Sequence, residues 1–333
     1  MIYCKCGDTF ISVKKLPRIT TKRTLINKNL IFILTVFCII IFGIISPSLI
    51  SLRHLLSISV IAVSLGLVAM GQTIVMITGH FDLSVGAVMT LTNVFGAGIF
   101  VNTDLPLFVV ILLLLCFGLV IGFINGYGVT KFKIPPFMMT LGMWLVLRGV
   151  VLVYTGGSPK GHWPDTIQFF SKYRIGGVIP ISTIFWVLLT VLGIYLLKKT
   201  TFGRQLFAVG GNPKAAFLSG VKVNRTIIWS FVLCSLLATI AGILLSGYVG
   251  WGSFQVGGDT YLMNSIAAAV LGGTTFSGGI GGLGGTFFGA YILTLIDSFL
   301  TMVGVGYAGR LVFMGAVIVV FTGFYEKISR LMK

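Results

Sequence analysis

Runs of about 20 apolar residues recur along almost the whole chain, and they restrict what it can fold into. Their apolar residues do not alternate with a period of two, which excludes spanning β-strands and is typical of membrane-crossing helices. Only 9% of the residues are charged, whereas soluble domains carry about 25%, so the chain cannot cover a water-facing surface. The sequence therefore predicts an all-α polytopic membrane protein.

The apolar runs predict about ten transmembrane helices between an N-terminal tail, 1–29, and a C-terminal tail, 326–333. The first run lacks a small-residue cleavage pattern, so it is expected to remain as a span rather than leave as a signal peptide. Residues 30–325 then form one transmembrane domain. The expected spans are 30–50, 56–78, 82–101, 106–128, 134–156, 177–197, 226–247, 261–277, 282–303 and 308–325.

The basic residues give these spans an orientation. With the N-terminus in the cytoplasm, 18 of the 24 Lys and Arg residues fall in cytoplasmic segments, which follows the positive-inside rule. Both termini and the loop 198–225 are therefore predicted to be cytoplasmic, and the loop 157–176 to face outward. This distribution accounts for the net charge of +17 without nucleic-acid binding.

Several classes of chemistry lack the residues they need. The pattern G-x-x-x-x-G-K-[ST] does not occur, so a separate subunit must supply any ATPase. Cys4 and Cys6 offer two metal ligands where zinc needs four, and the three His residues are scattered, so no metal site is expected. Few carboxylates lie near membrane depth, which argues against an ion-coupled symporter, and no catalytic constellation indicates an enzyme.

The cytoplasmic loop predicts a short, well-capped helix. Asn212 suits the N-cap, Pro213 the first turn, and Gly220 the left-handed residue after the end. Such a helix either ties two spans together or docks into the groove of a partner. The residues assigned to it are Asn212, Pro213, Lys214, Ala215, Ala216, Phe217, Leu218, Ser219 and Gly220.

Four motifs in order carry a family resemblance. They are "GHFDLSVGAV" (79–88), "KIPPFMMTLGMWLVLRG" (133–149), "TFGRQLFAVGGNPKAAFLSGVKV" (201–223) and "YLMNSIAAAVLGGTTFSGGIGGLGGTFFGA" (261–290). Together they resemble the permeases of bacterial ABC importers for monosaccharides of the ribose, galactose, arabinose and xylose group. His80 stands where the family usually has Gly, and Leu262 and Asn264 replace acidic residues of the ribose-type members. These departures leave the particular sugar open.

The resemblance implies a type II-like ABC importer permease in the bacterial cytoplasmic (inner) membrane, with 212–220 as the helix that couples to a partner ATPase. It implies a second permease copy, as a homodimer or heterodimer, and a periplasmic or lipid-anchored sugar-binding protein that docks near 157–176. This chain would bind no cofactor itself, because ATP and Mg²⁺ belong to the ATPase subunit. Permeases for branched-chain amino acids, nucleosides, urea or autoinducer-type sugars would share the fold and remain alternatives.

Five polar residues within spans are candidates for the translocation path: Asn93, Asn125, Arg148, Asn264 and Asp297. A charge at the centre of a spanning helix costs about 2.5–3.5 kcal/mol, so Arg148 and Asp297 are expected to find a partner or water. Their similar expected depth makes pairing with each other one hypothesis, and independent snorkelling the other. Each Asn is equally compatible with an interhelical hydrogen bond.

The first motif also includes Asp82, Ser84 and Gly86. Asp82 is expected at the cytoplasmic end of the third span, where it would cap the helix and meet the positive end of its dipole, with contact to the sugar as the alternative. The fourth motif includes a Gly-rich stretch, with nine Gly residues between 272 and 289. It predicts close helix packing, a broken helix along the path, or both.

Overall fold

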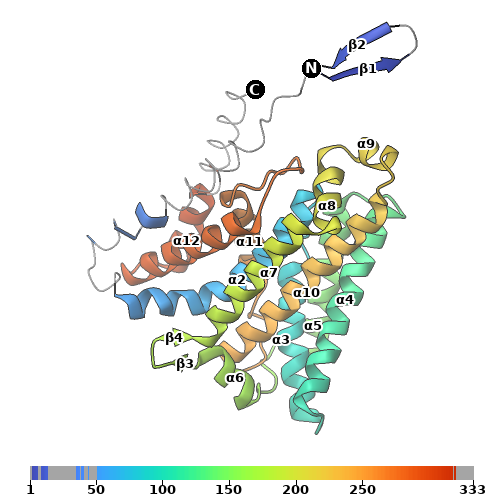
Figure 1. Cartoon of the computed structure of the whole chain (residues 1–333). Helices are drawn as coiled ribbons and strands as arrows, with labels where there is room; N and C mark the ends of the chain where they lie inside the picture. The colour runs from blue at the N-terminus through green and yellow to red at the C-terminus, as the bar shows by residue number, and fades with distance from the viewer. Residues whose placement is uncertain are drawn as a thin grey trace.

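Long apolar helices make up most of the structure, a computed structural model that describes residues 2–6, 9–13, 35–37, 39, 40, 44, 51–317 and 319 (Figure 1). Seven of these helices are long and apolar enough to cross a membrane, and each matches a predicted span. They are α2 (Leu52–Ile77), α3 (Val85–Asn102), α4 (Leu107–Thr130), α5 (Pro136–Thr155), α7 (Ile181–Lys199), α10 (Val223–Val249) and α12 (Leu283–Met302).

The other three predicted spans fare differently. The span at 30–50 lies largely outside the described residues, and the one at 308–325 is described only as a shorter apolar helix, Tyr307–Val317. The structure corrects the span at 261–277, because α11 (Asp259–Leu271) has only 13 residues. At a rise of about 1.5 Å per residue it extends about 20 Å, less than the roughly 30 Å of a bilayer core. Gly272 and Gly273, the latter with φ +88°, end it early.

The helices α2 and α10 form the centre of the bundle, and α2 is buried along nearly its whole length. Trp186 of α7 packs against α2 where Gly66 leaves room for its indole, which any side chain at that position would overlap. The same indole stacks on Phe287 of α12 with ring centroids 4.1 Å apart. One tryptophan thus joins three helices in the core.

A row of glycines brings α4 against α10. A Cβ at Gly122 would lie 2.7 Å from the carbonyl oxygen of Phe231, and a Cβ at Gly126 would lie 2.7 Å from the Cα of Ile228. At Gly118, a Cβ would overlap the hydroxyl of Thr239. Small residues at this spacing allow membrane helices to pack at backbone distance.

The loops 157–176 and 198–225 lie at opposite ends of the bundle (Figure 1). At one end are α8 (Thr201–Gly211) and α9 (Pro213–Leu218). At the other are α6 (Asp165–Lys172) and the two-residue strands β3 (Arg174–Ile175) and β4 (Ile179–Pro180). Near the N-terminus, β1 (Ile2–Cys6), which holds both tail cysteines, pairs antiparallel with β2 (Thr9–Val13).

Candidate functional site

The short helix expected in the 198–225 loop is present as α9, and its capping was predicted correctly. The Asn212 side chain accepts hydrogen bonds from the backbone N–H groups of Lys214 (3.0 Å) and Ala215 (3.1 Å). Gly220 has φ +82°, the left-handed conformation expected after the end. Phe217 and Leu218 are 70% and 84% exposed, so the helix presents an apolar tip to its surroundings.

The helix before it, α8, was not predicted. Thr200 caps it by accepting a hydrogen bond from the N–H of Gly203 (3.2 Å). That signal was visible in the sequence, because a Thr follows the basic end of a span and precedes a half-apolar stretch. The helix α8 ends at Gly211, directly before the Asn212 cap.

At the opposite end, Asn93 ties two outer segments to α3. Its amide nitrogen donates to the Ser246 hydroxyl (2.8 Å), and its oxygen accepts from the N–H of Ser253 (2.7 Å). The Trp163 indole, which belongs to the 157–176 loop, donates to the Asn93 carbonyl (3.0 Å). The side chain is fully buried. These contacts favour the interhelical alternative for Asn93 over a place in the path.

A buried polar group lies where α3 begins. The carboxylate of Asp82 accepts hydrogen bonds from the N–H (2.8 Å) and the hydroxyl (2.6 Å) of Ser84, and Asn125 of α4 donates to that hydroxyl (2.9 Å). The N-cap of α3 is Ser84, so Asp82 does not cap the helix as predicted but fixes the turn before it. Within the described residues, Asp82 Oδ2 and Asn125 Oδ1 have no hydrogen-bond partner. His80 stands beside this turn, with Nδ1 2.9 Å from the Thr78 carbonyl oxygen.

Gly86, the last glycine of the first motif, holds the start of α11. Its carbonyl accepts a hydrogen bond from the N–H of Gly258 (3.1 Å), and a Cβ at Gly86 would overlap the Gly258 carbonyl oxygen. Asp259, the first residue of α11, follows directly. The motif glycine thus sets where Asp259 lies.

Arg148 forms an ion pair with Asp259. The hypothesis that Arg148 and Asp297 pair with each other is therefore wrong. One guanidinium nitrogen reaches both carboxylate oxygens of Asp259, at 3.0 and 3.2 Å. The guanidinium also lies over the rings of Trp144 (5.1 Å to the centroid) and Phe254 (5.5 Å). Asp259 lies just before the predicted 261–277 span, which is why the sequence did not bring it forward as a partner.

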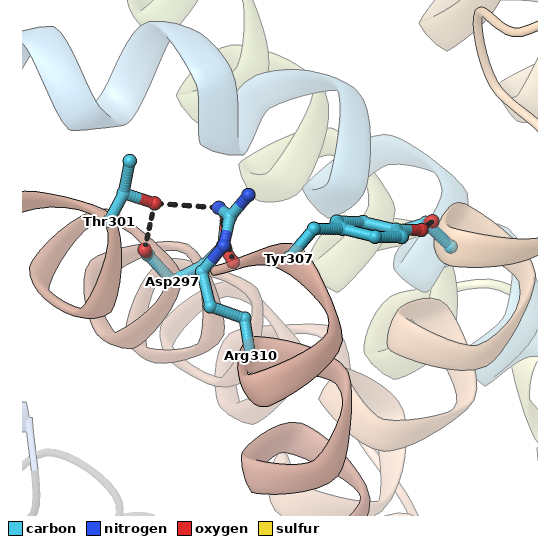
Figure 2. A network of polar contacts seen from close by, with 5 residues as sticks. Asp297, Thr301, Tyr307 and Arg310 are labelled. Atoms are coloured by element: carbon cyan, nitrogen blue, oxygen red, sulfur yellow. Dashed lines mark hydrogen bonds and ion pairs between the residues drawn. The ribbon is translucent and has the colours of Figure 1, made fainter. Parts of the chain in front are cut away.

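Asp297 forms a second ion pair, with Arg310 at 3.1 Å (Figure 2). Figure 2 shows Arg310 reaching back to α12, where it also donates to the Thr301 hydroxyl (2.6 Å). Tyr307 lies beside the Arg310 guanidinium, 5.8 Å from it, and its hydroxyl is 3.4 Å from that of Thr260. Because Thr260 follows Asp259, this contact connects the two ion pairs.

Arg148 and Asp297 each lie within a candidate span, and both ion pairs are partly exposed. Arg148 is 12 residues after Pro136 and Asp297 is 14 after Leu283, or about 18 and 21 Å along their helices. The side chains of Arg148 and Asp259 are 36% and 57% exposed, and that of Asp297 is 48% exposed. Because lipid-facing charges are expensive, this face of the chain is suited to water or another protein. Asn264, another candidate for the translocation path, is half-buried and lies in the middle of α11.

The Gly-rich stretch after α11 forms a turn, so the helix is broken here, while its place along a translocation path stays a prediction. The helix ends at Leu271 and α12 begins at Leu283, with Gly278 and Gly279 both at positive φ. Gly289 lies against the backbone of α11 and Gly285 against that of Gly272 directly after it, as the close-packing alternative expected. Among the described residues no group of three or more His, Cys, Asp or Glu could hold a metal ion.

Comparison with known proteins identifies relatives over most of the chain. The ribose import permease protein RbsC of Bacillus subtilis (strain 168) is 39% identical over 285 residues, which cover 85% of this chain and 87% of the relative. RbsC of Escherichia coli (strain K12) is 35% identical over 282 residues, 84% of this chain and 87% of the relative. The autoinducer 2 import system permease protein LsrC of Klebsiella pneumoniae is 38% identical over 238 residues, which cover 71% of this chain and 68% of the relative. No solved structure matches the chain.

The family model described as "Branched-chain amino acid transport system / permease component" matches residues 54–322. That match includes all seven candidate spans except the first two residues of α2, together with α8, α9 and the two ion pairs. With the permease relatives, these spans make the chain a multi-pass protein of the bacterial inner membrane. The chain therefore belongs to this family of ABC transporter permease components.

Proposed function

We propose that this chain is the transmembrane permease subunit of an ATP-driven importer and forms the path for a monosaccharide or a related polyol. The observation that carries the proposal is the similarity to ribose import permeases along 85% of the chain. The exposed, capped helix α9 and the partly exposed ion pairs of Arg148 and Asp297 support it, because they suit a partner on one side and a polar path within.

On the cytoplasmic side, a separate ATPase subunit takes α9 into a groove. The tip formed by Phe217 and Leu218 offers the apolar anchor for such a groove. Lys214 and Lys222 precede and follow this tip in the sequence and would favour an acidic rim. ATP and Mg²⁺ bind on that subunit, and this chain binds no cofactor.

Within the membrane, a second permease copy, identical or related, closes the path against the face that carries Arg148, Asp259, Asp297 and Arg310. With the N-terminus in the cytoplasm, as the distribution of Lys and Arg predicts, the 157–176 loop after the fifth predicted span faces outward, and a periplasmic or lipid-anchored sugar-binding protein docks there. In this arrangement the tails 1–29 and 326–333 flank one transmembrane domain, 30–325.

One alternative substrate class has specific support. The relative named for autoinducer 2 import is 38% identical, so an autoinducer-type sugar is the second candidate. The family description also names branched-chain amino acids, and nucleosides would keep the same mechanism. A secondary sugar symporter is less favoured, because the carboxylates of Asp259 and Asp297 are compensated by Arg148 and Arg310 and are not free for ion coupling.

Co-purification with the ATPase subunit tests the cytoplasmic half of the proposal. Replacing Phe217 and Leu218 with Ala removes the apolar tip without disturbing the core, and the ATPase should no longer co-purify. Phe169→Ala removes an exposed aromatic side chain at the opposite end and serves as the matched control, which should retain the ATPase. Full assembly of the Phe217/Leu218 variant would contradict the assigned role of α9.

The substrate is tested separately, with the permease, its ATPase and its binding protein reconstituted in liposomes. Uptake of labelled ribose should depend on ATP and be competed by unlabelled pentoses. Competition by a furanosyl autoinducer alone would favour the alternative, and competition by leucine alone would reject sugar import.

A further inference from the structure

Three chain segments meet backbone to backbone just before α9. Gly210 lies two residues before the Asn212 cap, and a Cβ there would overlap the carbonyl oxygen of Ile77 at the end of α2. The same Cβ would lie 2.5 Å from the backbone nitrogen of Gly279, in the turn between α11 and α12. No side chain separates α8 from these two segments.

The turn between α11 and α12 closes the contact from its side. Gly279 donates its N–H to the Ile77 carbonyl (2.9 Å). A Cβ at Gly278 would lie 2.7 Å from the nitrogen of Gly79 and 3.1 Å from the carbonyl oxygen of Gly210. We name these five residues, Ile77, Gly79, Gly210, Gly278 and Gly279, the glycine junction. Atoms packed this closely transmit displacement instead of absorbing it.

The glycine junction connects α9 to the two helices that lead into the membrane. The helix α2 runs through the centre of the bundle, and α11 carries Asp259 about 20 Å away at its far end. That end is fixed by the Gly86–Gly258 hydrogen bond and by the Arg148–Asp259 ion pair. A shift of α9 therefore has a direct route to the ion pair on the exposed face.

We propose that the glycine junction transmits the ATPase-driven displacement of α9 to α2 and α11, and that Gly210 is its positioning residue. The inference rests on the proposed coupling role of α9. It adds that coupling depends on backbone contact, so a single methyl group at Gly210 separates ATP hydrolysis from transport.

Neighbouring glycines provide the test. Gly210→Ala places its Cβ against Ile77, whereas a Cβ at Gly211 meets no atom within 4 Å, so Gly211→Ala is the matched control. The complete complex with ATPase and binding protein is reconstituted for each. Gly210→Ala should hydrolyse ATP within about twofold of the parent while uptake falls about tenfold, because contact and gating are uncoupled. Gly211→Ala should resemble the parent in both rates.

A second pair of variants, Gly278→Asn and its control Gly304→Asn, tests the proposal if Gly210→Ala fails to fold. Gly278→Asn keeps the positive φ of +77°, which Asn tolerates better than most residues, but adds a Cβ against Gly79. Gly304→Asn has φ +83° with open space around its Cβ and is the control. The ratio of uptake to hydrolysis should fall about tenfold in Gly278→Asn alone.

The outcomes separate this inference from the proposed function. Parent-like ratios of uptake to hydrolysis in folded Gly210→Ala and Gly278→Asn complexes would overturn the inference and leave the importer intact. Equal losses of both rates at equal thermal stability would also overturn it, because a merely structural role predicts no change in the ratio. Failure of the parent chain to assemble with an ATPase would instead reject the proposed function.

Discussion

At the scale of single residues, the two ion pairs join charges on different segments of the chain, Arg148 with Asp259 and Asp297 with Arg310. Arg148 and Asp297 were found because charges are rare in apolar runs, yet each pairs with a residue that the sequence did not single out, Asp259 and Arg310. Partner choice depends on how helices distant in the sequence pack, which no local pattern encodes. Asn93 shows the same limit, because its side-chain amide bonds the Ser246 hydroxyl, the Trp251 carbonyl oxygen and the Ser253 N–H, all more than 150 residues further along the chain.

The Arg148–Asp259 pair should matter more for transport than for stability. Both side chains are over one third exposed, so breaking the pair should lower the free energy of unfolding by no more than about 1 kcal/mol. Arg148→Gln and Asp259→Asn should each lower uptake in liposomes, and the exchanged pair Arg148→Asp with Asp259→Arg should recover part of it. Additive losses in this double-mutant cycle would show that the two residues act independently.

At the scale of elements, prediction succeeded where the signals are local and failed where tertiary contacts decide. The helix α9 was predicted because Asn212, Pro213 and Gly220 encode its ends within nine residues. The end of α11 was not, because a Gly-rich stretch is compatible with both a continuous packed helix and a break, and only the fold shows that the helix stops at Leu271 before Gly272 and Gly273. The family resemblance marked Gly86 but gave no physical reason for it.

Removing the α9 cap should weaken the docking element without unfolding the bundle. Asn212→Ala leaves the N–H groups of Lys214 and Ala215 without the side-chain oxygen that now accepts them, at a cost of about 1 kcal/mol to the helix. Affinity for the ATPase should fall by about the same free energy, whereas Asn212→Asp should preserve it. Surface plasmon resonance with the immobilised ATPase measures the affinity of both variants. An unchanged affinity of Asn212→Ala would show that docking does not depend on the capped helix.

Replacing either of two helical glycines, Gly122 and Gly142, with Ala should change the stability of the protein in different directions. Gly122→Ala forces α4 away from the backbone of α10 and should destabilise the protein by about 1–3 kcal/mol. Gly142→Ala on α5 meets no atom within 4 Å and should be neutral or stabilise by about 0.5–1 kcal/mol, since Ala favours helix more than Gly. Thermal unfolding in detergent compares them, and equal melting temperatures would count against the α4–α10 contact.

At the scale of the whole molecule, composition and charge were enough for the class of protein, and the seven described spans agree with it. The orientation remains a prediction that rests on the Lys and Arg distribution. Single cysteines at Phe169 and Leu218, both exposed and at opposite ends, test it in a cysteine-free background. A membrane-impermeant maleimide added to spheroplasts should label position 169 and spare position 218. The reverse pattern would invert the topology.

The shortness of α11 has a consequence for how the chain enters the membrane during synthesis. A 13-residue helix cannot leave the translocation channel for lipid by itself, because its backbone and its initial Asp259 would meet hydrocarbon unshielded. It must wait for α12, whose glycines provide its packing surface, and the two would be released together as a hairpin. A ribosome stalled when α11 has entered the channel and α12 is still in the exit tunnel should therefore hold α11 in the channel, whereas one stalled after α12 has also entered should not.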